Sequence, residues 1–249
     1  MLFAGILAGG SGRRMRFSDL PKQFLILGDK PVIIHTVEKF LAVPDFSQIY
    51  VGVHPEWQDY FEDLVQRYLP TAQERICIVA GAGDRAGTLR QILEAIEARY
   101  GQSAQHAIVS HDAVRPFVDV ACIEANIRAL ERWDMVDTVI PATDTIIASK
   151  DGEEISAIPP RQELYQGQTP QTFRIRRYLE VLDSLSPEEE ASLTDACKVF
   201  TLRQLPVGLV PGAGSNIKLT SVVDLKLAYA LIDEQLPASY QQQAVNHAQ

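Results

Sequence analysis

The chain has few cysteines, no long apolar run and a deficit of positive charge. Its three cysteines, Cys77, Cys122 and Cys197, form no CxxC pair, so reduced thiols in apolar surroundings are expected rather than a disulfide framework. No apolar stretch approaches the roughly 20 residues that span a bilayer. The first residues also lack the charged leader and cleavage site of a signal peptide. We therefore expect a cytoplasmic protein with no membrane partner.

The charge balance is acidic. The sequence holds 23 Lys and Arg residues against 32 Asp and Glu residues, for a formal net charge of −9. Such a charge disfavours nucleic acid as a partner, so any bound phosphate must meet a local basic cluster. With 249 residues, 46% of them hydrophobic, the chain is long enough to bury one large core. We expect one domain over residues 1–236 and a disordered tail over 237–249.

Short apolar runs rich in β-formers alternate with helical patterns. The runs lie at 2–7, 49–53, 76–79, 107–110 and 136–140, and amphipathic helices are predicted between them at 31–41, 55–68, 84–100 and 119–133. A further helix is predicted from a capping box at Ser221–Asp224 to about Glu234. This alternation is typical of βαβ units and predicts an α/β fold with a mostly parallel, twisted sheet flanked by helices.

Residues 143–168 interrupt this rhythm. Two β-like stretches, 145–149 and 154–158, flank a Lys-Asp-Gly-Glu turn, which predicts a β-hairpin. Such a ribbon either covers a site or reaches a second subunit. Because an isolated two-stranded hairpin is barely stable in water, a protruding β-arm that forms a homodimer is favoured.

Three glycines follow the first predicted strand in the stretch Ala8-Gly-Gly-Ser-Gly-Arg-Arg-Met15. Glycines allow backbone N–H groups to approach an anion closely, so this loop predicts a phosphate cradle. No Gly-Lys-Ser/Thr follows, which argues against a P-loop. Met15 stands where the third glycine of a dinucleotide fingerprint belongs, which argues against an NAD-dependent oxidoreductase.

Basic residues gather beside these glycines in a chain that is otherwise acidic. They are Arg13, Arg14, Arg16 and Lys22. A tight turn with solvated arginines is the simpler interpretation of a lone glycine-rich loop. The concentration of positive charge favours the binding of a triphosphate.

A second polar constellation, His111-Asp-Ala-Val-Arg-Pro116, follows the predicted strand 107–110. The carboxyl ends of strands in a parallel sheet carry ligand sites. Asp112 can hold Mg²⁺ through one carboxylate, with water and phosphate oxygens as the other ligands. Arg115 can contact the nucleotide or its phosphates. An Asp and an Arg at a strand end also form structural ion pairs, so their place in the sheet carries the functional interpretation.

Two further segments are weak signals when taken alone. Gly81-Ala-Gly-Asp-Arg85, with Thr88, joins a predicted strand to a helix and can present backbone groups to a base and ribose. Lys218 lies in a short β-like run before the final helix, where a lysine is most often solvated.

Taken together, the motifs resemble the IspD/TarI family of cytidylyltransferases and occur in the family's order from residue 4 to about 232. They are Ala-Gly-Gly-x-Gly-x-Arg-Met from Ala8, Pro-Lys-Gln-Phe from Pro21, His-Asp-x-x-Arg-Pro from His111, Thr-Pro-Gln-Thr-Phe from Thr169, Leu-Thr-Asp from Leu193 and Asn-Ile-Lys-Leu-Thr from Asn216. Each motif is short, and the specificity lies in their order.

This resemblance implies a Rossmann-like nucleotidyltransferase fold, a homodimer built through the β-arm, and Mg²⁺-dependent transfer of CMP from CTP to a polyol phosphate. Asp112 resembles the metal ligand. The residues that resemble the catalytic cations are Arg14, Lys22 and Lys218. The predicted nucleotide-binding residues are Leu7, Ala8, Gly9, Gly10, Gly12, Gly81, Asp84, Arg85, Thr88, Asp112, Ala113 and Arg115. Thr145, Arg161 and Thr194 match positions that contact the acceptor phosphate, the first two from the partner's arm.

Departures from the methylerythritol-phosphate branch point to the acceptor. Ala8-Gly9-Gly10 replaces the usual Ala-Ala-Gly, and the spacing from Met15 to Pro21 is one residue longer. The sequence is thus more similar to the ribitol-5-phosphate branch, which implies synthesis of CDP-ribitol for teichoic acid or a related polymer. The alternatives are transfer to 2-C-methyl-D-erythritol 4-phosphate and a non-catalytic nucleotide-binding protein.

Overall fold

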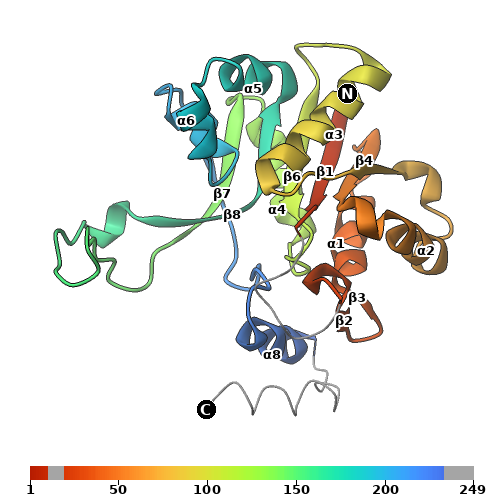
Figure 1. The fold of residues 1–249 in the computed structure, drawn as a ribbon, viewed down its shortest axis with the longest axis horizontal. Helices are drawn as coiled ribbons and strands as arrows, with labels where there is room; N and C mark the ends of the chain where they lie inside the picture. The colour runs from red at the N-terminus through yellow and green to blue at the C-terminus, as the bar shows by residue number, and fades with distance from the viewer. Residues whose placement is uncertain (11–19, 233–249) are drawn as a thin grey trace.

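The computed structural model of the chain describes residues 1–10 and 20–232 (Figure 1). Its centre is a seven-stranded sheet in the order β5-β4-β1-β6-β8-β7-β9. The strands are β1 (Leu2–Ala8), β4 (Gln48–Val53), β5 (Ile76–Ala80), β6 (Ala107–Asp112), β7 (Met135–Pro141), β8 (Tyr165–Arg174) and β9 (Gly208–Pro211). All neighbours pair in parallel except β8, which runs antiparallel to β6 and β7. The predicted α/β fold with a mostly parallel sheet is confirmed.

Helices cover both faces of this sheet. One face packs against α1 (Val32–Leu41), α2 (Gln58–Tyr68) and α4 (Val120–Ala129), and the other against α3 (Arg85–Tyr100), α5 (Ile175–Leu182) and α7 (Cys197–Thr201). The remaining elements are α6 (Pro187–Ala191), α8 (Val222–Leu231), the strands β2 (Ile26–Leu27) and β3 (Lys30–Pro31), and the 3₁₀ turns η1 (Lys22–Phe24), η2 (Pro55–Trp57), η3 (Gln73–Arg75) and η4 (Arg161–Glu163).

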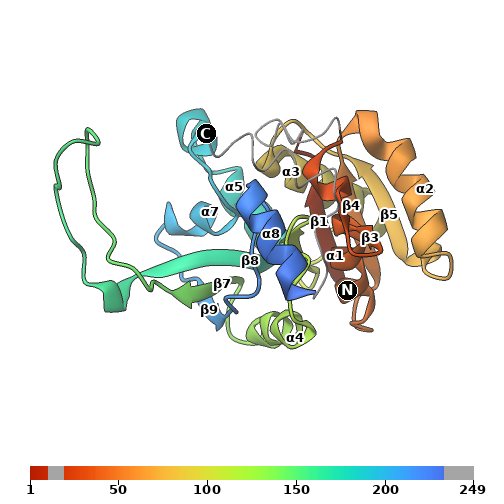
Figure 2. The ribbon, with the colours of Figure 1, turned by 90° about the horizontal axis from the view of Figure 1, so that it is seen from below.

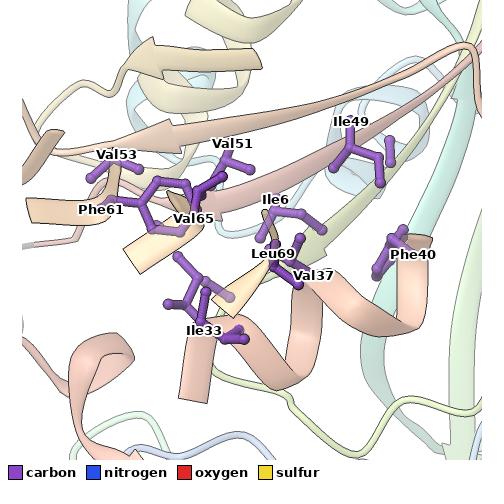
Figure 3. Close-up of a cluster of buried hydrophobic side chains, with 14 of the residues drawn as sticks. Ile6, Ile33, Val37, Phe40, Ile49, Val51, Val53, Phe61, Val65 and Leu69 are labelled. Atoms are coloured by element: carbon purple, nitrogen blue, oxygen red, sulfur yellow. The ribbon is translucent and has the colours of Figure 1, made fainter. Parts of the chain in front are cut away.

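The interior strand β1 contributes to the hydrophobic clusters on both faces of the sheet because successive side chains of a strand point to opposite faces. Ile6 packs with the α1 and α2 side of the sheet, whereas Phe3 and Leu7 pack with α3 and α5. On the first side, α1 contributes Ile33 and Phe40 from one helical face, as Figure 3 shows. Burial of these apolar side chains holds β1 between β4 and β6, and so determines where its carboxyl end places the loop that follows.

Helix starts agree with the capping signals in the sequence. Asp84 accepts a hydrogen bond from the Gly87 N–H at the start of α3, at 2.7 Å. Ser221 and Asp224 form a reciprocal capping box at the start of α8, which satisfies backbone donors that would otherwise lack a partner. The cap role of Asp224 is therefore confirmed. The structure gives α8 as Val222–Leu231, and the predicted end near Glu234 lies outside the described residues.

The arm at 143–164 extends away from the sheet in both views (Figures 1 and 2). The chain reverses at the predicted turn, where Asp151 Oδ1 accepts from the N–H groups of Glu153 and Glu154. The two predicted strands of this hairpin are wrong, since one isolated bridge, Ala148 to Ala157, is all that pairs them. Most residues of the arm are exposed, so the arm buries little of its own surface.

The described cysteines are free thiols: Cys197 is buried, and Cys77 and Cys122 are half-buried. Within residues 1–10 and 20–232, no helix has both the length and the apolar character that crossing a bilayer demands.

Candidate active site

A cavity of about 310 Å³ opens at the carboxyl edge of the sheet, where β1, β6 and the β5–α3 loop converge. We call it the glycine-loop cavity. This is the position in which parallel sheets bind ligands. It is lined by Leu7, Ala8, Gly9, Gly10, Lys22, Gln23, Gly83, Asp84, Arg85, Thr88, Asp112, Ala113, Val114 and Lys218.

A second cavity of about 180 Å³ adjoins the first, and we call it the Thr194 cavity. It shares Arg85, Asp112 and Lys218 with the glycine-loop cavity. Its other lining residues are Arg115, Gly167, Gln168, Thr169, Gln171, Thr194 and Asp195. A larger depression of about 620 Å³ lies at the opposite edge of the sheet and holds none of the predicted site residues. A further depression of about 340 Å³ adjoins them and shares Asp84, Arg85, Thr194 and Asp195 with their linings, but Asp112 and Lys218 line only the two smaller cavities. We take these two cavities as the candidate site.

Asp112 is the point at which the two cavities meet. Its carboxylate accepts a hydrogen bond from Arg85 Nε at 3.1 Å on Oδ1. On Oδ2 it lies 2.9 Å from Lys218 Nζ and 3.5 Å from Arg115 Nε. The Asp112 side chain is only 8% exposed, whereas that of Lys218 is 40% exposed and reaches the cavity opening. Three cations around one carboxylate leave a net positive site in a chain of net charge −9.

Burial and charge act in opposite directions on the Asp112 carboxyl. Burial raises its pKa, but Arg85, Lys218 and Arg115 outweigh that effect and hold the pKa well below its usual range. Asp112 is therefore ionised at neutral pH. Since a lone buried carboxylate is costly, the three cations are what make an anion at this position possible.

A chain of hydrogen bonds holds the loop that carries Asp112. The Arg115 carbonyl accepts from His111 Nε2 at 3.1 Å, so that nitrogen bears the proton. Thr169 Oγ1 then donates to His111 Nδ1 at 2.9 Å and accepts from the Asp112 N–H at 3.2 Å. Burial lowers the pKa of His111 to about 4, which keeps the imidazole neutral. His111 thus orients the loop and carries no charge of its own.

The start of the glycine loop is fixed by a side chain that sequence reasoning did not single out. Gln23 is buried, and its Nε2 donates to the carbonyls of Ala8 at 3.0 Å and Gly10 at 3.2 Å. These bonds turn the loop carbonyls toward Gln23. The Pro-Lys-Gln-Phe motif was a signal for this segment, yet it did not say which member held the loop.

The chain matches, over residues 2–234, the family described as IspD: 2-C-methyl-D-erythritol 4-phosphate cytidylyltransferase. It belongs to this family. Curated relatives named ribitol-5-phosphate cytidylyltransferase, from several strains of Streptococcus pneumoniae, are 49% identical over 94% of this chain and 100% of theirs. The IspD/TarI resemblance is thereby confirmed.

Solved structures of the IspD family share the fold. A 4-diphosphocytidyl-2C-methyl-D-erythritol synthase from Anaerococcus prevotii superimposes with a TM-score of 0.77 at 25% identity, covering 94% of this chain and 98% of that one. A 2-C-methyl-D-erythritol 4-phosphate cytidylyltransferase from Thermus thermophilus gives 0.71 at 24% identity, over 94% and 100%. The latter shows the fold alone.

Most residues that the IspD/TarI resemblance pointed to lie in these cavities. Gly81 sits behind Gly9 rather than in the lining, because a Cβ on it would be 3.0 Å from the Gly9 Cα. Arg115 lines the Thr194 cavity, where its Nη1 donates to the Asn216 carbonyl at 2.7 Å. Lys218 lies in an irregular segment and not in the β-like run expected for it.

Two predicted positions lie elsewhere. Thr145 and Arg161 are on the exposed arm, away from both cavities, and Arg161 Nη1 donates to the Thr143 carbonyl at 3.0 Å. Gly12 and Arg14 fall outside the described residues.

The IspD/TarI resemblance implies Mg²⁺, and the carboxylates that line the two cavities show whether they could hold this ion. Among the described residues, no group of three or more His, Cys, Asp or Glu side chains is placed to hold a metal. Asp112 therefore offers a single carboxylate beside Asp84, whose Oδ1 is engaged by the α3 cap. Such a site does not fit a metal that needs a protein cage, but it fits Mg²⁺, which keeps water and substrate phosphate among its ligands.

Close packing at Gly9 leads to a stability prediction. A Cβ at Gly9 would overlap Thr88 Oγ1 and stand 2.9 Å from the Ala82 carbonyl, whereas one at Gly10 meets no described atom within 4 Å. Gly9→Ala should therefore lower the free energy of unfolding by about 1–3 kcal/mol, while Gly10→Ala should change it by less than about 0.5 kcal/mol. Denaturant titration of the two variants checks this, and equal losses would refute the packing argument.

Proposed function

We propose that the chain transfers CMP from CTP to D-ribitol 5-phosphate, giving CDP-ribitol and pyrophosphate. The observation that carries this proposal is the junction of two cavities at Asp112, with Arg85, Arg115 and Lys218 around it. Ribitol-5-phosphate cytidylyltransferases at 49% identity over their whole length support the choice of acceptor. Such a product serves reactions that build polyol-phosphate polymers such as teichoic acid, and its nucleotide substrate favours a cytoplasmic enzyme.

In the proposed reaction a phosphate oxygen of the acceptor attacks the α-phosphorus of CTP in line, and pyrophosphate leaves. Both substrates are polyanions, so the protein must position them and neutralise their charge rather than supply a covalent nucleophile. The glycine-loop cavity accepts the triphosphate, and the Thr194 cavity accepts the polyol phosphate. Attack then takes place at the shared wall of Asp112 and Lys218.

Each charged residue has a separate task in this proposal. Lys218, half exposed at the junction, swings from Asp112 to the phosphate oxygens on which charge develops. Lys22 faces the same cavity from η1, and Arg14 belongs to the glycine loop. Asp112 would hold Mg²⁺, which, when bound, neutralises charge on the phosphate oxygens.

The main alternative is transfer to 2-C-methyl-D-erythritol 4-phosphate, the acceptor in the name of the family and of the structural neighbours. Both acceptors are polyols that end in a phosphomonoester, so the charge pattern around Asp112 suits either. The experiment is pyrophosphate release with CTP and Mg²⁺ and each acceptor in turn. We expect kcat/KM for ribitol 5-phosphate to exceed that for the alternative by at least about 10²-fold. A reversed ratio would assign the chain to the other acceptor. No pyrophosphate release with either acceptor would indicate a non-catalytic nucleotide-binding protein.

We further propose that two chains associate through the arm and that Thr145 and Arg161 act in the partner's site. Four isoleucines on the arm, Ile146, Ile147, Ile155 and Ile158, are 40 to 59% exposed. Apolar side chains on a segment with one internal bridge are suited to a partner surface. A guanidinium suits a terminal phosphate because it can donate two parallel hydrogen bonds.

Subunit mixing tests this arrangement. Arg161→Ala and Lys218→Met should each be nearly inactive, because one lacks the acceptor contact and the other a catalytic cation. When the two chains are co-expressed, each mixed dimer contains one intact site, and about a quarter of wild-type activity should return. A mixture no more active than either variant alone would show that Arg161 does not serve the partner's site.

A further inference from the structure

Gln171 lines the Thr194 cavity, and all the polar atoms of its amide have hydrogen-bond partners. The residue lies on β8 and is 2% exposed. Its Oε1 accepts from Arg85 Nη2 at 2.9 Å and from the Ala196 N–H at 3.3 Å. Its Nε2 donates to Asp137 Oδ1 at 3.1 Å and to Cys197 Sγ at 3.4 Å. Two donors face the oxygen and two acceptors face the nitrogen, so the orientation of the amide is fixed by its surroundings.

The partners of Gln171 belong to both halves of the site. Arg85, on α3, is the residue that holds Asp112 Oδ1 at 3.1 Å. Ala196 directly follows Thr194 and Asp195, which line the Thr194 cavity. One side chain is thus bonded to the cation beside the glycine-loop cavity and to the backbone of the segment that forms the other cavity.

The backbone of Gln171 is equally constrained. It pairs with Ser110 of β6 and Asp137 of β7, and the Ser110 hydroxyl donates to its carbonyl at 2.9 Å. A buried polar side chain is stabilising only when every group is satisfied, and a network of this kind rigidifies what it joins. If the position needed only to be filled, an apolar side chain would serve, so the polar amide requires another explanation.

Asp137 extends the network away from the cavities. Burial raises the pKa of its carboxyl to about 6, with the nearby Asp195 acting in the same direction and Gln171 and Arg85 acting against it. The Gln171 amide donates to this poorly solvated acid on one side while it accepts from Arg85 on the other. The order Asp137, Gln171, Arg85, Asp112 is one continuous chain of hydrogen bonds.

We propose that Gln171 is a positioning residue that couples the two cavities. It fixes the segment 193–196 relative to Arg85 and Asp112, and so sets the distance from the acceptor phosphate to the α-phosphorus of CTP. The inference rests on the proposed function, because it needs two substrates that must be aligned. No contact between Gln171 and either substrate is required.

Gln171→Leu removes the four side-chain bonds and keeps most of the volume. We expect kcat to fall by about 10- to 10²-fold, as misalignment of reacting groups does, and the acceptor KM to rise. The KM for CTP should stay within about threefold of wild type, since the glycine loop is held by Gln23 and not by Gln171. An unchanged kcat with a lowered melting temperature would show a structural role only and overturn the proposal.

If Gln171→Leu folds poorly, exchanging the amide of Gln171 and the carboxylate of Asp137 provides a second test. Gln171→Glu places a carboxylate against Asp137 and should lose activity as Gln171→Leu does. In the double variant Asp137→Asn/Gln171→Glu, the amide at position 137 can donate to the carboxylate at position 171. Its kcat should therefore be at least about tenfold higher than that of Gln171→Glu alone. Asp137→Asn alone can still accept through its Oδ1 and should remain within about threefold of wild type. No recovery in the double variant would refute the hydrogen-bond chain.

Failure of the inference is separable from failure of the proposed function. Wild-type turnover with CTP and ribitol 5-phosphate, measured in the same series, tests the function alone. If wild type turns over and the Gln171 variants match it, only the coupling role is lost.

Discussion

Asp112→Asn should lower kcat with CTP and the polyol phosphate by about 10³-fold or more, the largest loss expected of any single change, because one carboxylate serves both cavities. The neutral amide cannot hold Arg85, Arg115 and Lys218 together, since the Asp112 charge is the partner that all three share within residues 1–10 and 20–232. In the proposed reaction it would also bind Mg²⁺ more weakly than a carboxylate, because the amide carries no negative charge. Pyrophosphate release under saturating substrates measures the loss.

The same change should cost stability in a pH-dependent way. Removing one member of a buried charge cluster is destabilising, and we expect about 2–3 kcal/mol because Lys218 is partly exposed and Arg85 keeps Gln171. The folded pKa of Asp112 lies below its unfolded value of about 3.9. Its contribution is therefore complete above that pH and is lost as the pH falls through it toward the folded value. The stability gap between wild type and Asp112→Asn should be constant from about pH 6 to 8 and narrow below about pH 4.

A matched control is available on the same sheet edge. Asp119 caps α4 by accepting from the Ala121 N–H at 3.2 Å and lines neither cavity. Because asparagine is as good an N-cap as aspartate, Asp119→Asn should keep wild-type kcat and stability. If Asp112→Asn kept more than about a tenth of wild-type kcat, the junction at Asp112 would not be the reaction centre.

Lys218→Met should lower kcat by about 10²-fold, as removal of one group that stabilises developing charge does. Lys218 Nζ is 2.9 Å from Asp112 Oδ2, and its half-exposed side chain can turn to substrate without leaving the site. Methionine keeps the aliphatic stem and removes the charge. Stability should change little, because a partly exposed ion pair contributes about 0–1 kcal/mol.

The matched variant is Lys226→Met, on the exposed face of α8 and eight positions further along the chain. It removes the same charge from the same acidic protein and should leave kcat unchanged. Equal losses in the two variants would mean that net charge, rather than the placement of Lys218, governs turnover. A fully active Lys218→Met enzyme would remove this lysine from the mechanism.

The strands that could be predicted are the ones made of continuous apolar residues. The predicted runs 2–7 and 107–110 lie within β1 and β6, because central parallel strands are buried on both faces and read as apolar segments. The strand β8 could not be found in this way. Its buried part runs from Gln168 to Phe173, is mostly polar, and contains a proline that normally argues against a strand. Those polar side chains are buried because distant segments satisfy them, and a linear sequence does not show such partners.

In the candidate site too, some residues could be predicted from the local sequence and others could not. The position of Asp112 was predicted because it follows an apolar strand, and that of Arg85 because it lies at the start of a helix. Lys218 lies 106 positions from Asp112, and family resemblance alone brought it to the site. Gln23 and Gln171 were missed because neutral amides give no charge pattern, and their importance appears only when all their hydrogen bonds are seen.

The arm shows the limit of local patterns. Its turn was predicted from the Lys-Asp-Gly-Glu stretch and is present, with Gly152 at a φ of +83°. Its strands were predicted from β-formers such as Ile146 and Ile155, which lie exposed in the single chain. Strand formation depends on a surface to pack against, and one chain does not supply it.

The most direct test of the reaction is the fate of isotopic oxygen. Ribitol 5-phosphate labelled with ¹⁸O in its non-bridging phosphate oxygens would be turned over with unlabelled CTP, and both products analysed by mass spectrometry. Attack of the acceptor phosphate on the α-phosphorus predicts that all of the label stays in CDP-ribitol and that pyrophosphate carries none. Label in pyrophosphate, or turnover of CTP without a CDP-linked product, would contradict it.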